Sequence, residues 1–150
     1  GYVMKRQQAR LLSVIALYQY DINNGDQVDF EQALLLTEDY HELEVAPEVQ
    51  AFAQELYDGT VSHLDKIDEV IKQSLFKWTL DRLSYVDRAI IRLATYELLF
   101  TATPAPIVIN EAMEITKYFC VDEEEIQVKF NNRVLDSIKE KVGSVIENDQ

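Results

Sequence analysis

The stretch from Val86 to Phe100, VDRAIIRLATYELLF, constrains the fold most, because it is apolar on nearly all sides when it is wound into a helix. One stripe is formed by Val86, Ile90, Leu93 and Phe100, and the other sides by Ile91, Leu98 and Leu99. A helix that is apolar all round lies in the middle of a bundle. Glu97 falls within the main stripe, so we expect its carboxylate to have a hydrogen-bonding or cationic partner in a structural pair.

The rest of the chain has the same helical period, with no strand-like alternation and no internal repeat. A first helix is predicted from Met4 to Ile22, where the apolar residues Leu11, Ile15, Tyr18 and Ile22 recur at steps of four, three and four. Further helices are predicted near Phe30–Tyr40, over Pro47–Tyr57, from near Ser62, over Pro106–Phe119, and in a last segment where Val134, Ile138 and Val142 face the core. With four glycines and three prolines in 150 residues, the predicted fold class is all-α: a compact single-domain helical bundle of about seven helices.

Short polar signals indicate where several of these helices begin and end. Three capping-box-like pairs precede helices: Ser62 with Asp65, Ser84 with Asp87, and Asp122 with Glu125. The Pro47–Tyr57 helix starts with a proline and ends before Gly59. In TATPAP, the prolines disfavour helix at the residues before them, so the central helix stops there.

The Pro106–Phe119 helix carries two glutamates that invite a catalytic reading. Its pattern turns Val108, Ala112, Ile115 and Phe119 inward and Glu111, Glu114 and Tyr118 outward. Paired carboxylates do acid–base work only in a cleft that perturbs their pKa values. We therefore interpret Glu111 and Glu114 as a polar helix face.

Charge is distributed unevenly along the chain. The formal net charge of −13 excludes wholesale, nonspecific nucleic-acid binding, which needs a basic surface. Residues 1–20 nevertheless hold three basic side chains, Lys5, Arg6 and Arg10, and no acidic one, whereas residues 21–60 hold eleven acidic side chains and no lysine or arginine. We expect one domain over residues 1–150, with a basic N-terminal arm at about 1–10 and a flexible C-terminal tail at about 144–150.

Motifs for catalysis are missing or weak. The glycines cannot build a phosphate-cradling loop, which excludes the common nucleotide-binding fingerprints. Glu38 and His41 have the Glu-x-x-His spacing of di-metal bundles, but the second copy is absent, so a solvated surface pair is the better interpretation. Cys120 stands alone, and we interpret it as a buried thiol in a reducing, intracellular setting. We predict no enzymatic activity, no metal and no cofactor.

The sequence has no stretch of about 18 uninterrupted apolar residues, so no membrane span is expected. The start, GYVMKRQQAR, contains basic residues but no apolar signal core. We therefore expect a cytoplasmic protein.

Four blocks of sequence resemble the NusB family of transcription antitermination factors. They are ARLLSVIALYQYD (Ala9–Asp21), WTLDRLSYVDRAIIRLATYELL (Trp78–Leu99), TPAPIVINEAMEITKYF (Thr103–Phe119) and KFNNRVLDSI (Lys129–Ile138). The blocks follow the family's order and spacing, and the most specific parts are 86–99 and 109–115. Residues 23–77 match only as generic helix.

The resemblance implies an all-helical, noncatalytic RNA-binding protein. Family members pair with a small-subunit ribosomal protein, NusE, and together bind the boxA element of nascent RNA within an antitermination complex on RNA polymerase; they occur as monomers and as homodimers. By this resemblance, the RNA-binding residues are Lys5, Arg6, Arg10, Tyr18, Phe119, Lys129 and Phe130, and the partner-binding residues are Asp81 and Asp87. The basic residues would contact phosphates and the rings would stack on unpaired bases.

Alternative roles stay open for several of these residues. Tyr18 and Phe119 lie in inward stripes, so core packing is at least as good an interpretation, whereas Phe130 lies on the shoulder of a stripe and is the better stacking candidate. Asp81 has a helix-start role as its alternative. Arg133 replaces a family glycine, and either restores a phosphate contact or changes how the last helix packs.

Two departures from the family pattern predict weaker RNA binding: the arm has fewer arginines than the family usually carries, and the loop CVDEEEIQV is longer and more acidic, which favours local repulsion of phosphate. Alternative hypotheses are therefore a ribosomal-protein-binding scaffold with weak or lost RNA binding, a helper domain of an rRNA methyltransferase, and a metal-dependent bundle enzyme.

Overall fold

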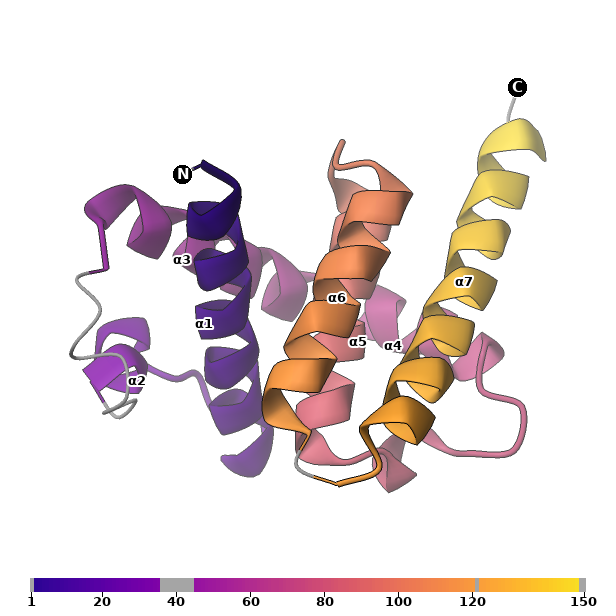
Figure 1. The fold of residues 1–150 in the computed structure, drawn as a ribbon, viewed down its shortest axis with the longest axis horizontal. Coiled ribbons are helices and arrows are strands. Elements are labelled where there is room, and N and C mark those ends of the chain that lie inside the picture. The colour runs from indigo at the N-terminus through magenta and orange to yellow at the C-terminus, as the bar shows by residue number, and fades with distance from the viewer. Residues whose placement is uncertain (1, 36–44, 121, 149–150) are drawn as a thin grey trace.

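The computed structural model describes residues 2–35, 45–120 and 122–148, and these residues form seven α-helices and one 3-10 turn, with no strand among them. The elements are α1 (Tyr2–Ile22), α2 (Phe30–Leu35), α3 (Pro47–Ser62), α4 (Leu64–Gln73), η2 (Leu80–Arg82), α5 (Tyr85–Phe100), α6 (Ala105–Phe119) and α7 (Glu124–Asn148), shown in Figure 1. The predicted all-α bundle is confirmed.

Helix α5 is the centre of the bundle, as its all-round apolarity predicts. It packs against α1, α3, α4, α6 and α7, and its residues Ile90, Ile91 and Leu93 are buried. Helix α1 packs on α3 and α5, whereas α7 packs on α5 and α6. Figure 1 shows α1 and α7 on opposite sides of the α5–α6 pair.

The predicted stripes of α1 and α5 need correction at their edges. Phe100 is exposed, because it is the last residue of α5 and its ring lies at the surface, 4.1 Å between centroids from the His63 ring. In α1, Ile22 is also exposed, and the most buried positions include the small residues Ala9 and Ser13. The Ser13 hydroxyl lies 2.8 Å from the Ala53 carbonyl of α3, so small side chains let these two helices approach closely.

The prediction that the helix ends before Gly59 is wrong, because Gly59 lies inside α3. A Cβ at this position would come within 2.2 Å of the Tyr96 ring, so the absence of a side chain permits the close contact of α3 with α5. The helix runs on to Ser62, whose hydroxyl donates to the Asp58 carbonyl. The predicted capping pair of Ser62 with Asp65 is therefore wrong, because the hydroxyl serves the preceding helix.

Of the other two capping pairs, one is confirmed and one is wrong. The Ser84 side chain accepts a 3.1 Å hydrogen bond from the Asp87 backbone N–H at the start of α5. The pair of Asp122 with Glu125 is wrong, because α7 starts at Glu124. The residue directly before the helix is therefore Glu123, which has a φ of 57°, and not Asp122.

Some sequence predictions fall outside the described residues. Helix α2 ends at Leu35, and the remainder of the predicted Phe30–Tyr40 helix, with Glu38 and His41, lies in 36–44. Helix α7 continues through Asn148, so the backbone of 144–148 is helical where a flexible tail was expected; 149 and 150 lie outside. No described helix is long and apolar enough to cross a membrane.

Candidate nucleic-acid and protein interface

The basic arm on α1 contains one arginine that is buried. Arg10 is 3% exposed, and its Nε and one terminal nitrogen each lie 2.9 Å from a carboxylate oxygen of Glu97 on α5. The expected partner of Glu97 is thus confirmed. Because this bidentate pair ties α1 to α5, Arg10 has a structural role here, and its phosphate contact stays a prediction.

The other two basic residues of the arm are nearer the surface. Lys5 is exposed and forms an ion pair with Glu48 of α3. The Arg6 guanidinium lies 4.6 Å from the centre of the Phe52 ring. Arg6 and Arg10 both line a hollow of about 530 Å³ between α1, α3, α5 and the start of α6. An exposed pair such as Lys5–Glu48 contributes little to stability, so the ammonium group can be released to another anion.

Glu111, predicted to point outward, is buried, and that prediction is wrong. Its Oε2 atom has no hydrogen-bond partner. Burial raises the pKa of the Glu111 carboxyl above its usual value, while the nearby positive charge of Arg10 lowers it. The negative charges of Glu114 and Glu97 add to the upward shift of this pKa. Glu114 and Tyr118 are exposed as predicted.

Helices α1 and α6 end on the same side of the bundle (Figure 1), and two predicted stacking residues, Tyr18 and Phe119, lie in their last turns. Tyr18 is half-buried, and its ring meets Tyr85 edge to face with 6.2 Å between centroids. Phe119 is half-buried against Tyr118 at 5.1 Å. Both rings pack against the core cluster, in agreement with the packing alternative, while part of each surface stays exposed.

Phe130 lies in what we call the aromatic groove, defined by Phe76, Trp78, Phe130 and Arg133. These residues line a hollow of about 270 Å³. Trp78 meets Phe130 edge to face at 6.4 Å, and the Arg133 guanidinium lies 5.9 Å from the Phe130 ring centre. Phe76 is 81% exposed and Trp78 50% exposed. An exposed aromatic surface beside a guanidinium suits the flat faces of unpaired bases.

Sequence reasoning missed Phe76 and Trp78 as site residues. The available signal was two aromatic residues in SLFKW, a segment without a continuous helical period. For Arg133, the structure places the side chain at the surface beside Phe130. Lys129 is also exposed, and it pairs with Glu125 at 3.0 Å one helical turn away.

Asp87 is held at both of its carboxylate oxygens. Its Oδ2 accepts a 2.6 Å hydrogen bond from the Ser84 hydroxyl, and its Oδ1 accepts a 3.1 Å bond from Asn131 of α7. The side chain is half-buried in the first turn of α5, where a negative charge is favoured by the helix dipole. The Asp87 carboxylate is thus held in one orientation, and part of the side chain stays exposed to solvent.

Asp81 lies on η2 and is exposed. A hydrogen bond from the Thr79 side chain lowers the pKa of its carboxyl below the usual value, and the positive charges of Arg82 and Arg88 add to this effect. Asp81 is therefore ionised at neutral pH, in the segment that leads into α5. We call Asp81 and Asp87 the acidic face.

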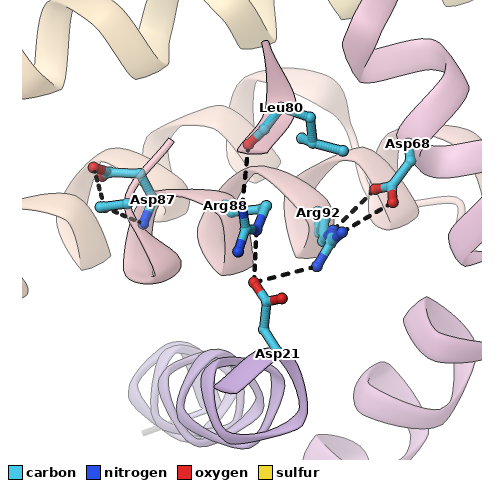
Figure 2. A network of polar contacts seen from close by, with 7 residues as sticks. Asp21, Asp68, Leu80, Asp87, Arg88 and Arg92 are labelled. Atoms are coloured by element: carbon cyan, nitrogen blue, oxygen red, sulfur yellow. Dashed lines mark hydrogen bonds and ion pairs between the residues drawn. The ribbon is translucent and has the colours of Figure 1, made fainter. Parts of the chain in front are cut away.

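Next to Asp87 on α5, two arginines bind polar groups of neighbouring elements (Figure 2). Arg88 Nε lies 2.6 Å from Asp21 of α1, and a terminal nitrogen donates to the Leu80 carbonyl at 3.2 Å. Arg92 binds both oxygens of Asp68 on α4 at 2.9 Å. The charged residues among the apolar ones of α5 therefore join α1, α4 and η2 to the central helix.

Comparison with known proteins identifies the family. A model of the NusB family matches residues 7–140. The chain belongs to the NusB family. The transcription antitermination protein NusB of a Nitratiruptor species is 40% identical over 137 residues, which cover 91% of this chain and 93% of that protein. NusB of Bacillus licheniformis is 39% identical, with coverage of 91% and 97%.

Solved NusB structures have the same fold. T. maritima NusB superposes with a TM-score of 0.73 at 36% identity and covers 90% of each chain. A structure of the antitermination factors NusB and NusE in complex with dsRNA gives a TM-score of 0.76 at 25% identity, covering 92% of this chain and 98% of that one.

In this NusB-family chain, the predicted RNA-binding residues are not brought together into one site. Lys5 and Arg6 lie on α1, whereas Lys129 and Phe130 lie on α7, on the other side of the α5–α6 pair (Figure 1). The hollows beside Arg6 and beside Phe130 share no lining residue. The acidic face is at the end of the bundle where α5 begins.

Other candidate chemistry has little support in the described part of the chain. Cys120, predicted to be a buried thiol, is half-buried. Partial burial and the charge of Asp87 raise the pKa of its thiol, which keeps it protonated. No three histidine, cysteine, aspartate or glutamate side chains of 2–35, 45–120 and 122–148 lie together as a metal site.

Proposed function

We propose that this chain is a noncatalytic, cytoplasmic transcription antitermination factor. It binds boxA-type leader RNA together with a NusE-type small-subunit ribosomal protein, and supports processive rRNA transcription within an RNA polymerase antitermination complex. The observation that carries the proposal is the shared fold over 92% of this chain with a NusB in complex with NusE and RNA. Residues 1–150 act as one domain.

Within the proposed RNA site, the aromatic groove supplies the exposed surface on which bases stack. A single-stranded base gains about 1–3 kcal/mol by stacking on an aromatic side chain, and every base has a face that can stack. Phe76 and Trp78 offer such faces at the surface, and Phe130 and Arg133 line the same hollow. Stacking depends little on net charge, so it is compatible with a chain of −13.

Lys5 and Arg6 add phosphate contacts on the other side of the bundle, and Lys129 adds one near the groove. Lys5 and Lys129 first have to leave Glu48 and Glu125. These few cations predict a shallow dependence of RNA affinity on salt, because each released counterion contributes separately to the slope.

The acidic face fits the protein partner. Asp81 is ionised and exposed, and Asp87 is fixed in the first turn of α5. Rim carboxylates orient a basic ribosomal protein and raise its association rate more than they raise affinity. With the partner bound, two weak RNA surfaces act together, since the second contact becomes intramolecular.

The test is RNA binding with and without the NusE-type protein, using a boxA-like oligomer and a scrambled oligomer at two salt concentrations. We expect the partner to raise affinity for the boxA-like oligomer selectively. Equal affinity for both oligomers in the presence of the partner would contradict the RNA half of the proposal.

A second candidate function is a ribosomal-protein-binding scaffold with weak RNA affinity. It is favoured by the carboxylates that already pair with Lys5 and Lys129 and by the exposed acidic run 122–125 ahead of the aromatic groove. In the same experiment, partner binding without any RNA preference would select this function.

A further inference from the structure

Asn131 is a fully buried polar side chain that follows Phe130 on α7, with 0% of its surface exposed. Its amide nitrogen donates to Asp87 Oδ1 on α5 and to Thr116 Oγ1 on α6, both at 3.1 Å. Its amide oxygen accepts from Gln127 at 3.1 Å. One side chain therefore joins three helices below the acidic face.

The direction of these hydrogen bonds is fixed by their neighbours. The Thr116 hydroxyl donates to the Ala112 carbonyl at 2.8 Å, so towards Asn131 it acts as the acceptor. A carboxylate such as Asp87 only accepts. Both amide hydrogens of Asn131 are therefore used, and the amide has a single orientation.

This arrangement is more than core filling. A leucine fills nearly the same volume without the need to satisfy a buried amide, so packing alone does not call for asparagine here. What the amide adds is a donor aimed at Asp87. The opposite oxygen of Asp87 is held by Ser84, so the carboxylate is restrained from both sides.

We propose that Asn131 is a positioning residue that presets the Asp87 carboxylate for a lysine or arginine side chain of the basic protein partner. This rests on the proposed function. A carboxylate already fixed in its bound orientation loses less conformational freedom when the partner binds, so affinity rises without a new contact. Asn131 itself, being buried, does not touch the partner.

The test compares Asn131→Leu with Thr116→Val, a matched control that removes another bond of Asn131 and leaves the bond to Asp87. The Kd for the NusE-type protein is measured by calorimetry, and folding is checked by thermal melting. We expect Asn131→Leu to weaken partner binding by about tenfold and Thr116→Val by less than about twofold.

A double-mutant cycle separates positioning from general loosening of the fold. In the Asp87→Ala background, Asn131→Leu should have no further effect on the Kd, since there is no carboxylate left to position. An equal loss in both backgrounds, or a wild-type Kd for Asn131→Leu, overturns the inference.

A measurement on the wild-type chain keeps the inference falsifiable if a variant fails to fold. The side-chain amide resonances of Asn131 should shift on titration with the partner, whereas those of Asn110, an exposed amide on α6, should not. Absence of a shift overturns the inference while leaving the proposed function intact. If the wild-type chain does not bind the partner at all, the partner half of the proposed function fails and the inference falls with it.

Discussion

The basic arm and the aromatic groove are both proposed to bind RNA, but they differ in how the fold has already used their side chains. In the arm, Arg10 is buried against Glu97, and Lys5 is paired with Glu48. In the groove, the Phe76 and Trp78 side chains are exposed, and their rings form no ion pair. The comparison teaches that stacking should supply more of the RNA affinity than cations do.

The largest expected effect distinguishes two members of the arm. Arg10→Ala leaves Glu97 buried without its partner, which should lower the free energy of unfolding by about 3–5 kcal/mol and the Tm by roughly 10 °C. Lys5→Ala, which removes an exposed pair, should change it by less than about 0.5 kcal/mol. Thermal melting of both variants checks this, and equal small losses would show that Arg10 is not structural.

The next effect concerns the aromatic groove. Trp78→Ala and Phe130→Ala should each weaken RNA binding by about 1–3 kcal/mol, because each removes a stacking surface. Fluorescence anisotropy with a labelled boxA-like oligomer measures this loss. Tyr118→Ala removes an exposed ring outside the groove and is the control. A loss as large for the control would place the RNA elsewhere.

Salt dependence sharpens the same comparison. Lys5→Gln should reduce the slope of log K against log salt by about 0.7 if its ammonium meets one phosphate of a single strand. Phe130→Ala should lower affinity without changing that slope. If the slope of log K against log salt falls for Phe130→Ala, the groove binds RNA through charge and not through stacking.

The smallest effect comes from Glu111, which lies near Arg10. Its raised pKa means that the folded state holds more protons than the unfolded state between the ordinary value of 4.5 and the raised one, so stability falls as pH rises through that window. Glu111→Gln should therefore be more stable than wild type at pH 7, by roughly 1 kcal/mol. Urea titrations at pH 7 and pH 4 measure the difference, which should vanish at the lower pH.

The sequence predicted the architecture well, because helical period and capping depend on near neighbours. The central position of α5 and the Ser84–Asp87 cap followed from spacing alone. The misplaced residues depend on distant ones. Glu111 is buried close to the charge of Arg10 on α1, and Gly59 leaves room for the Tyr96 ring of α5.

The candidate site was predicted less well than the fold. Periodicity indicates which side of a helix is apolar, but it does not say whether a charged residue on that side finds a partner, as Arg10 does with Glu97. Trp78 lies outside the helices, where no period assigns exposure. The family resemblance supplied the predicted site residues, and the structure adds the groove around one of them.

The position of α1 and α7 on opposite sides of the α5–α6 pair has a consequence for ligand length (Figure 1). Neighbouring helix axes are about 8–10 Å apart, and α1 and α7 begin at opposite ends of the bundle, so an RNA strand that reaches from the arm to the groove has to cross at least roughly 20 Å of protein. The width of the bundle therefore sets a minimum length for an RNA that contacts both surfaces. An oligonucleotide shorter than this distance can occupy only one of the two surfaces, and trimming the RNA past that length should remove one contact in a single step.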